Sequence, residues 1–134
     1  MAYKKRILVV EVVEDSKELL NAISDKLVSQ GYEVARLTNG KTGLDWALKN
    51  HPDIILLDLQ MPVMDGKAML GKLRTDKWGA KAPVIILTNA DDNASIYEVV
   101  GMGTSSSLND YCVKADTSLE EIVELIQQKL DITI

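Results

Sequence analysis

Phenylalanine is absent from the chain, and tryptophan and tyrosine bring the aromatic residues to only 4% of its 134 residues. Because hydrophobic residues still make up 46%, the core must be built from aliphatic side chains. The single cysteine, Cys112, excludes an internal disulfide and suits a reducing cytosol. No apolar run is long enough to span a membrane, and the N-terminus shows no signal-peptide pattern. These absences predict a cytoplasmic protein without a membrane segment.

Basic residues are in the minority, with 15 lysines and arginines against 20 acidic residues and a net charge of −5. A protein that binds nucleic acid directly needs a basic surface to displace counterions from the phosphates, so this balance argues against that function. The length fits one domain, and we expect a single domain over residues 1–134.

Apolar runs of strand length alternate along the chain with segments whose apolar residues recur at helical spacing. Asn39 and Gly40 are expected to form a turn, and Ser118 with Glu121 matches a helix capping box. Strands and helices in strict alternation predict an α/β fold, with a parallel sheet covered by helices on both faces. The expected strands cover residues 7–13, 33–37, 53–57, 84–87 and 111–113; the expected helices cover 16–30, a short segment marked by 44–48, 66–75, 94–102 and 118–130.

The apolar run Ile-Ile-Leu-Leu at 54–57 ends at one carboxylate, Asp58, and Pro62 and Gly66 then turn the chain away. Such a run is typical of a strand that is buried on both faces, so Asp58 stands where this strand leaves the core. This segment alone supports two interpretations equally. Asp58 either caps the following loop, or it serves as a nucleophile or metal ligand at the mouth of a parallel sheet.

Polar groups follow other expected strands as well: Glu14 and Asp15 after the first, Thr88 after the fourth and Lys114 after the fifth. The ligand site of an open parallel sheet lies at the carboxyl ends of its strands, so these groups are expected to meet Asp58 there. Singly, each has an ordinary explanation, such as a helix cap for Asp15 or a surface charge for Lys114. Their joint placement is what favours a site.

Clustered acids at one edge would repel each other, and a hard divalent cation with oxygen ligands removes that repulsion. Magnesium fits best, because it retains water and pairs with phosphate oxygens. A nearby lysine and hydroxyl can stabilise a transferred phosphoryl group, and a carboxylate can accept one as an aspartyl phosphate.

With these motifs in order, the sequence resembles the receiver domains of two-component response regulators. The segment Asp58-Leu-Gln-Met-Pro-Val-Met-Asp65-Gly66 matches the phosphoacceptor segment of that family, and the stretches 53–58, 84–88 and 111–114 match its other landmarks. The resemblance covers roughly residues 6 to 130. It implies a doubly wound, flavodoxin-like sheet of five parallel strands in the order 2-1-3-4-5.

The resemblance also assigns the metal site. It implies that Asp58 is the phosphoacceptor and that Asp15 is a direct ligand of Mg²⁺. Glu14 is expected to support the ion through water, and the backbone carbonyl of Gln60 to complete the protein's share of the ligands.

The same resemblance implies a switch. Thr88 is expected to bond the phosphoryl group, Lys114 to pair with Asp58 or its phosphate, and Tyr111 to act as the switch aromatic. The face that changes would be formed by the helix expected over 94–102, the strand over 111–113 and the C-terminal helix.

The implied function is phosphoryl acceptance on Asp58 from a histidine kinase or a histidine phosphotransfer protein, in a magnesium-dependent reaction that switches the signalling face. The protein would not be a metabolic enzyme, because it would catalyse only its own phosphorylation and dephosphorylation. An output domain or protein would contact the switched face, and the chain would be a monomer or a phosphorylation-dependent dimer.

The alternative is a degenerate receiver that acts as a docking module independent of phosphorylation. A magnesium-dependent phosphatase is disfavoured, because Gln60 stands where such an enzyme has a second aspartate.

Several positions depart from the family pattern. Choosing Glu11 for the acidic pair would give it Val12 as its neighbour and lengthen the first helix, so Glu14 with Asp15 is preferred. Ala115 follows Lys114 where the family often has proline, so a cis bond is not expected there. The loop at 103–109 adds length next to the expected output face. The only histidine, His51, is expected to be a loop residue rather than a ligand or phosphodonor.

Overall fold

The computed structural model describes residues 6–10, 17–58, 64, 66–88, 109–113 and 117–132, with the backbone alone at 6–10, 88, 109–111, 113 and 131–132. Its centre is a five-stranded parallel sheet in the order β2-β1-β3-β4-β5. This confirms the predicted α/β class and the strand order that the family resemblance implied. The strands are β1 (Arg6–Val10), β2 (Glu33–Leu37), β3 (Ile54–Asp58), β4 (Val84–Thr88) and β5 (Asn109–Val113).

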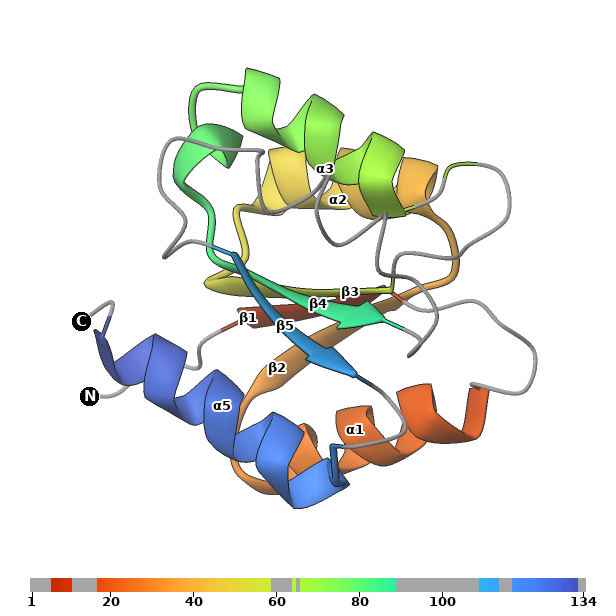
Figure 1. Cartoon of the computed structure of the whole chain (residues 1–134), viewed down its shortest axis with the longest axis vertical. Coiled ribbons are helices and arrows are strands. Elements are labelled where there is room, and N and C mark those ends of the chain that lie inside the picture. Colours follow the sequence, from red (N-terminus) through yellow and green to blue (C-terminus); the bar gives the residue numbers. More distant parts are fainter. Residues whose placement is uncertain are drawn as a thin grey trace.

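Helices cover both faces of the sheet, as Figure 1 shows. One layer consists of α1 (Lys17–Ser29) and α5 (Leu119–Ile132). The other consists of α2 (Gly40–Asn50) and α3 (Gly66–Thr75), followed by the 3₁₀ turn η2 (Gly79–Lys81). Within the part of the chain that the structure describes, no helix has the length and apolar character needed to cross a membrane.

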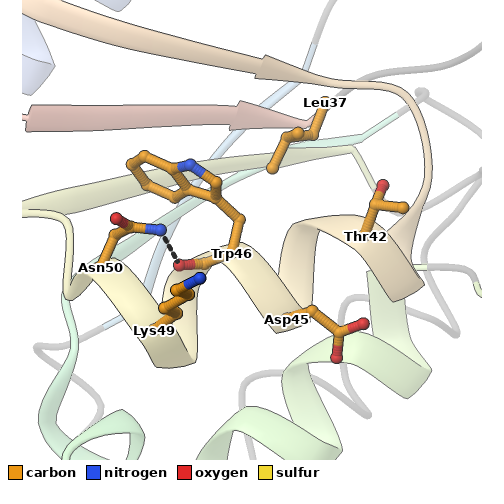
Figure 2. A pocket seen from close by; sticks show the side chains of 6 residues that line it. All are labelled: Leu37, Thr42, Asp45, Trp46, Lys49 and Asn50. Atoms are coloured by element: carbon orange, nitrogen blue, oxygen red, sulfur yellow. Dashed lines mark hydrogen bonds between the residues drawn. The ribbon is translucent and has the colours of Figure 1, made fainter.

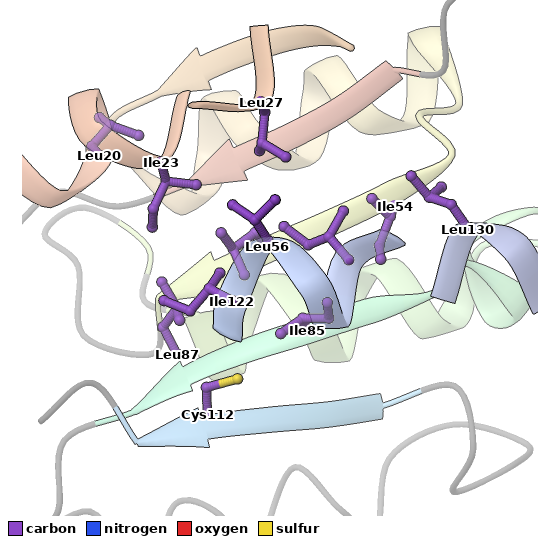
Figure 3. Close-up of a cluster of buried hydrophobic side chains, with 12 residues drawn as sticks. Leu20, Ile23, Leu27, Ile54, Leu56, Ile85, Leu87, Cys112, Ile122 and Leu130 are labelled. Atoms are coloured by element: carbon purple, nitrogen blue, oxygen red, sulfur yellow. The ribbon is translucent and has the colours of Figure 1, made fainter. Parts of the chain in front are cut away.

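The sheet divides the core into two clusters. Side chains of a strand alternate between its faces, so neighbouring residues of β3 and β4 contribute to opposite clusters. Leu56 and Ile85 pack with α1 and α5, whereas Leu57 and Ile86 pack with α2 and α3. Figure 3 shows the first cluster, which is aliphatic apart from Cys112.

The N-terminus of α2 differs from the sequence prediction. Asn39 and Gly40 were expected to form a turn, but Asn39 is the N-cap and Gly40 is the first residue of the helix. The side-chain oxygen of Asn39 accepts the Thr42 N–H at 3.0 Å, which satisfies one of the donors left free at a helix N-terminus. The predicted capping box at the start of α5 is confirmed, since Ser118 Oγ accepts the Glu121 N–H at 3.1 Å and Glu121 Oε1 accepts the Ser118 N–H at 3.3 Å.

A second difference is η2 and the turn before it, which the sequence did not predict. Arg74 donates to the carbonyl oxygens of Gly79 at 2.8 Å and Ala82 at 2.7 Å. Asp76 Oδ2 accepts the Gly79 N–H at 2.8 Å. Burial lowers the pKa of the Arg74 guanidinium from its ordinary value by desolvation.

The other described bounds lie within two residues of those expected. The strand 33–37 and the helix 66–75 are confirmed to the residue, and β5 begins two residues earlier than expected, at Asn109. Residues 11–13 of the expected first strand, the expected helix 94–102 and the loop 103–108 lie outside the described residues, as do Glu11 and Ala115.

Candidate functional site

Asp58 is the last residue of β3, the central strand of the sheet, and its side chain is only 1% exposed. It pairs with Leu87 of β4 in the strand register. A carboxylate at this burial requires polar or cationic neighbours, because transferring an isolated charge out of water is costly. The end of β3 is therefore built to hold a charged group at a fixed place on the carboxyl edge of the sheet.

The carboxyl end of β1 lies beside Asp58. Val10, the last described residue of β1, pairs with Leu57, and neighbouring strands run about 4.8 Å apart. The chain therefore leaves β1 next to the acceptor position, and Glu14 and Asp15 follow within five residues of Val10. Both acids lie outside the described residues, so their assignment as magnesium ligands stays a prediction.

The ends of β4 and β5 lie on the other side of Asp58. Thr88 directly follows Leu87, the partner of Asp58, and pairs with Val113 of β5. Lys114 is the next residue after Val113 in the chain. The backbone thus brings position 88 to the edge beside Asp58. Position 114 directly follows the end of β5, which lies next to position 88.

Tyr111 pairs with Ile86, two residues before the end of β4. The side chains of Thr88 and Tyr111 and the whole of Gln60 and Lys114 lie outside the description, so their proposed roles also stay predictions.

The loop after Asp58 is fastened to the N-terminus of α2. The carbonyl oxygen of Met64 accepts the Gly40 N–H at 3.0 Å, which satisfies a second free donor of that helix. Met64 is partly buried and packs against the cluster under α2 and α3. This contact is not predictable from the sequence pattern, although Asn39 followed by Thr42 is a recognisable helix start.

The expected metal ligands are all oxygen donors, but Asp58 is the only one whose side chain the structure describes. Within the described ranges, His, Cys, Asp and Glu form no group of three or more that could hold a metal ion. The metal prediction therefore depends on Glu14, Asp15 and Gln60 joining Asp58 at the carboxyl edge.

His51 lies away from this edge, in the connection between α2 and the amino end of β3. This agrees with the prediction that it is a loop residue. It caps the C-terminus of α2 in the left-handed conformation, with φ of 51°, and its N–H donates to the Ala47 oxygen at 2.8 Å. Its ring stacks on Trp78, with centroids 4.3 Å apart and planes 7° from parallel.

A family model described as the response regulator receiver domain matches residues 10–127. The chain belongs to this family. Among curated proteins, the receiver domain is 39% identical over 103 residues to response regulator PleD of Caulobacter vibrioides, covering 77% of this chain and 22% of PleD. It is 34% identical over 119 residues to the transcriptional regulatory protein HprR of Escherichia coli K12, covering 89% of this chain and 50% of HprR.

Solved structures agree with this assignment. The receiver domain of the sensor histidine kinase PA1611 from Pseudomonas aeruginosa PAO1 has a TM-score of 0.78 and 25% identity, covering 96% of this chain and 99% of that one. The PA1611 domain contains a magnesium ion coordinated in its active site cleft. Since this chain spans no more than half the length of PleD and HprR, only their receiver portions are comparable with it.

Proposed function

We propose that this receiver domain accepts a phosphoryl group on Asp58 from a phosphohistidine of a histidine kinase or a histidine phosphotransfer protein. In the transfer, the phosphorus–nitrogen bond of the donor breaks and a bond to a carboxylate oxygen of Asp58 forms. The observation that carries the proposal is a carboxylate with 1% exposure at the end of the central strand, in a chain of the receiver family. Because burial already restricts the Asp58 side chain, its oxygen can attack the phosphorus atom without a further loss of conformational entropy.

Magnesium is the proposed cofactor. Asp58, Asp15 and the carbonyl of Gln60 would hold it directly, and Glu14 through water. Hard oxygen donors suit this ion, and a buried carboxylate beside it suits its charge. When bound, Mg²⁺ supplies positive charge that offsets the oxygens of the phosphoryl group. The magnesium ion in the PA1611 receiver domain supports this assignment by similarity.

Thr88 and Lys114 are the proposed stabilising groups, and Tyr111 the residue that moves with Thr88. Their support is the register, which sets Thr88 beside Val113 at the edge where Asp58 ends β3. A hydroxyl and an ammonium group placed there would bond the phosphoryl oxygens while charge develops on them. The resulting two-state change would be read by an output domain or protein, with no catalytic turnover of a separate substrate.

Phosphorylation with acetyl phosphate and Mg²⁺ tests the proposal. We expect intact-mass spectrometry to detect one added phosphoryl group on the wild type and none on Asp58→Asn. The matched control is Asp45→Asn on α2, which removes an exposed carboxylate from another element and should label normally. Lys114→Ala should slow labelling at least about tenfold, because it removes a charge that acts in the transition state.

A wild type that stays unmodified, and that shows no spectroscopic response to beryllofluoride with Mg²⁺, would overturn the proposal. That result would favour the docking module that needs no phosphorylation.

A further inference from the structure

The two helical layers carry opposite exposed charges. The described residues of α2, α3, η2 and the turn between them expose five lysines and a single acid, Asp45. Those of α1 and α5 expose five acids and a single lysine, Lys17. Since the whole chain has a net charge of −5, a basic layer is a local departure from its average. The exposed lysines are Lys41, Lys49, Lys72, Lys77 and Lys81, and the exposed acids are Glu18, Asp25, Glu120, Glu121 and Glu124.

The basic layer contains a groove on the side of α2 that faces β2. Figure 2 shows its lining, and its volume is about 530 Å³. Leu37 and the half-buried indole of Trp46 form the apolar wall nearer the sheet, while Lys49 and Asp45 stand on the outer side of the helix. Thr42 and Asn50 add polar groups at its two ends. An apolar wall beside an ammonium group suits an aliphatic side chain that has a carboxylate close by.

The acidic layer presents that combination on α1. Val28 is 57% exposed and is the one large hydrophobic side chain that lies open to solvent among those the structure describes. Asp25 precedes it by three positions, so the two side chains lie on the same side of the helix. Asp25 is exposed as well. The C-terminal half of α1 therefore carries an aliphatic group next to a carboxylate.

We propose that the groove on α2 binds the α1 surface of a second copy of this chain, with Val28 against Trp46 and Leu37 and with Asp25 beside Lys49. The opposite charges of the two layers orient the copies as they approach. Asp45 disfavours the reversed placement, because it would then stand against Asp25.

Because the groove and its occupant are different surfaces, the contact is heterologous. A bound pair leaves one groove and one α1 surface free, so further copies add head to tail. The 11 residues of α2 span about 16 Å, which is short for an interface that holds a permanent dimer. The association is thus weak and salt-dependent, and it needs neither Asp58 nor a phosphodonor.

Sedimentation velocity at increasing concentrations of the unphosphorylated chain tests the contact. We expect self-association at about 0.01 M salt that weakens at least tenfold at about 1 M, as the Debye length falls from about 30 Å to about 3 Å. Val28→Ser should weaken it at least about tenfold at low salt, because the apolar anchor is lost. Val28 is exposed, so this substitution leaves the core intact.

A charge exchange makes the test specific. Asp25→Lys and Lys49→Glu should each abolish association alone, whereas an equimolar mixture of the two variants should associate like the wild type. Glu124→Lys is the matched control: it changes the charge of the acidic layer equally but lies on α5, and it should weaken association only about twofold through long-range attraction.

Monomers at every concentration and salt, or an equimolar mixture that stays dissociated, would overturn the proposal. The proposal would also be overturned if the chain did not self-associate but bound a DNA oligonucleotide, and if Lys49→Glu abolished that binding. The phosphorylation test is scored separately by mass, so failure of either idea leaves the other standing.

Discussion

The two helical layers are attached to the same sheet in different ways. Beneath α1 and α5, the buried cluster is aliphatic apart from Cys112, with the partly buried Tyr32 packed against it. Side-chain hydrogen bonds such as that from Arg36 to Asn21, at 3.0 Å, lie at the surface. Beneath α2 and α3, the buried cluster also includes Met69, and the partly buried Trp46 and Trp78 pack against it. This second layer is in addition tied by directional bonds, among them those of Arg74 and the Gly40–Met64 bond.

The difference shows two solutions to one problem. Packing of branched aliphatic side chains is non-directional, so it needs the right volume rather than particular residues. Hydrogen bonds between loops need particular groups at particular places. The layer that holds the loop after Asp58 uses both.

The largest expected effect on the free energy of unfolding comes from creating a cavity in each cluster in turn. Ile85 and Ile86 are neighbours on β4, both fully buried, and they face opposite layers. Each Ile→Ala change should lower the free energy of unfolding by about 2–5 kcal/mol, measured by urea denaturation. We expect the smaller loss for Ile86→Ala, because methionines in its cluster can shift into the space.

Both variants should unfold in one transition with the m-value of the wild type, since the layers share every strand of the sheet. Two separate transitions for Ile86→Ala would show instead that the α2–α3 layer unfolds independently.

A smaller effect is expected from glycines of the α2–α3 layer. A Cβ at Gly79 would overlap the backbone carbonyl of Leu73, which a side-chain movement cannot relieve. Gly79→Ala should therefore destabilise the protein by about 1–3 kcal/mol in the same assay. Gly71→Ala is the matched control on α3, because no atom lies within 4 Å of its Cβ position. It should stabilise the helix by about 0.5–1 kcal/mol. Equal losses at the two glycines would contradict the tight contact at η2.

The smallest effect belongs to the α1–α5 layer. Ser24 is 2% exposed, and its hydroxyl has no hydrogen-bond partner among the described atoms. Ser24→Ala removes this unsatisfied group and should raise the free energy of unfolding by about 1 kcal/mol. Ser29→Ala, which removes an exposed hydroxyl bonded to the Lys26 oxygen, should change it by less than about 0.5 kcal/mol. Thermal melts of both variants compare them, and a loss of stability in Ser24→Ala would mean that the hydroxyl is satisfied.

The fold was predictable because hydrophobic periodicity is local and strong. The runs at 33–37 and 66–75 carry complete signals, and their elements have the expected bounds. The start of β5 was missed because Asn109 and Asp110 are polar, and their place in the sheet comes from pairing with Val84 and Ile85. The turn at η2 was missed because its bonds join Arg74 to carbonyls that only the folded chain brings near.

The candidate site was less predictable from local sequence than the fold was. Asp58 stood out because an apolar run ends at a carboxylate, and its burial agrees with that interpretation. The strand ends placed Glu14, Asp15, Thr88 and Lys114 at the same edge, because the carboxyl ends of parallel strands meet there. Their individual roles, and the carbonyl of Gln60 as a ligand, came from the family resemblance.

The hydrogen bond from Gly40 to Met64 gives the receiver domain a natural spectroscopic probe. The amide proton of Gly40 belongs to α2, yet its acceptor lies in the loop that follows Asp58. Amide chemical shifts depend on the length and angle of the hydrogen bond that they donate. The Gly40 resonance should therefore report any movement of that loop in an ordinary ¹⁵N–¹H correlation spectrum. Neither a fluorophore nor a substitution at the site is needed.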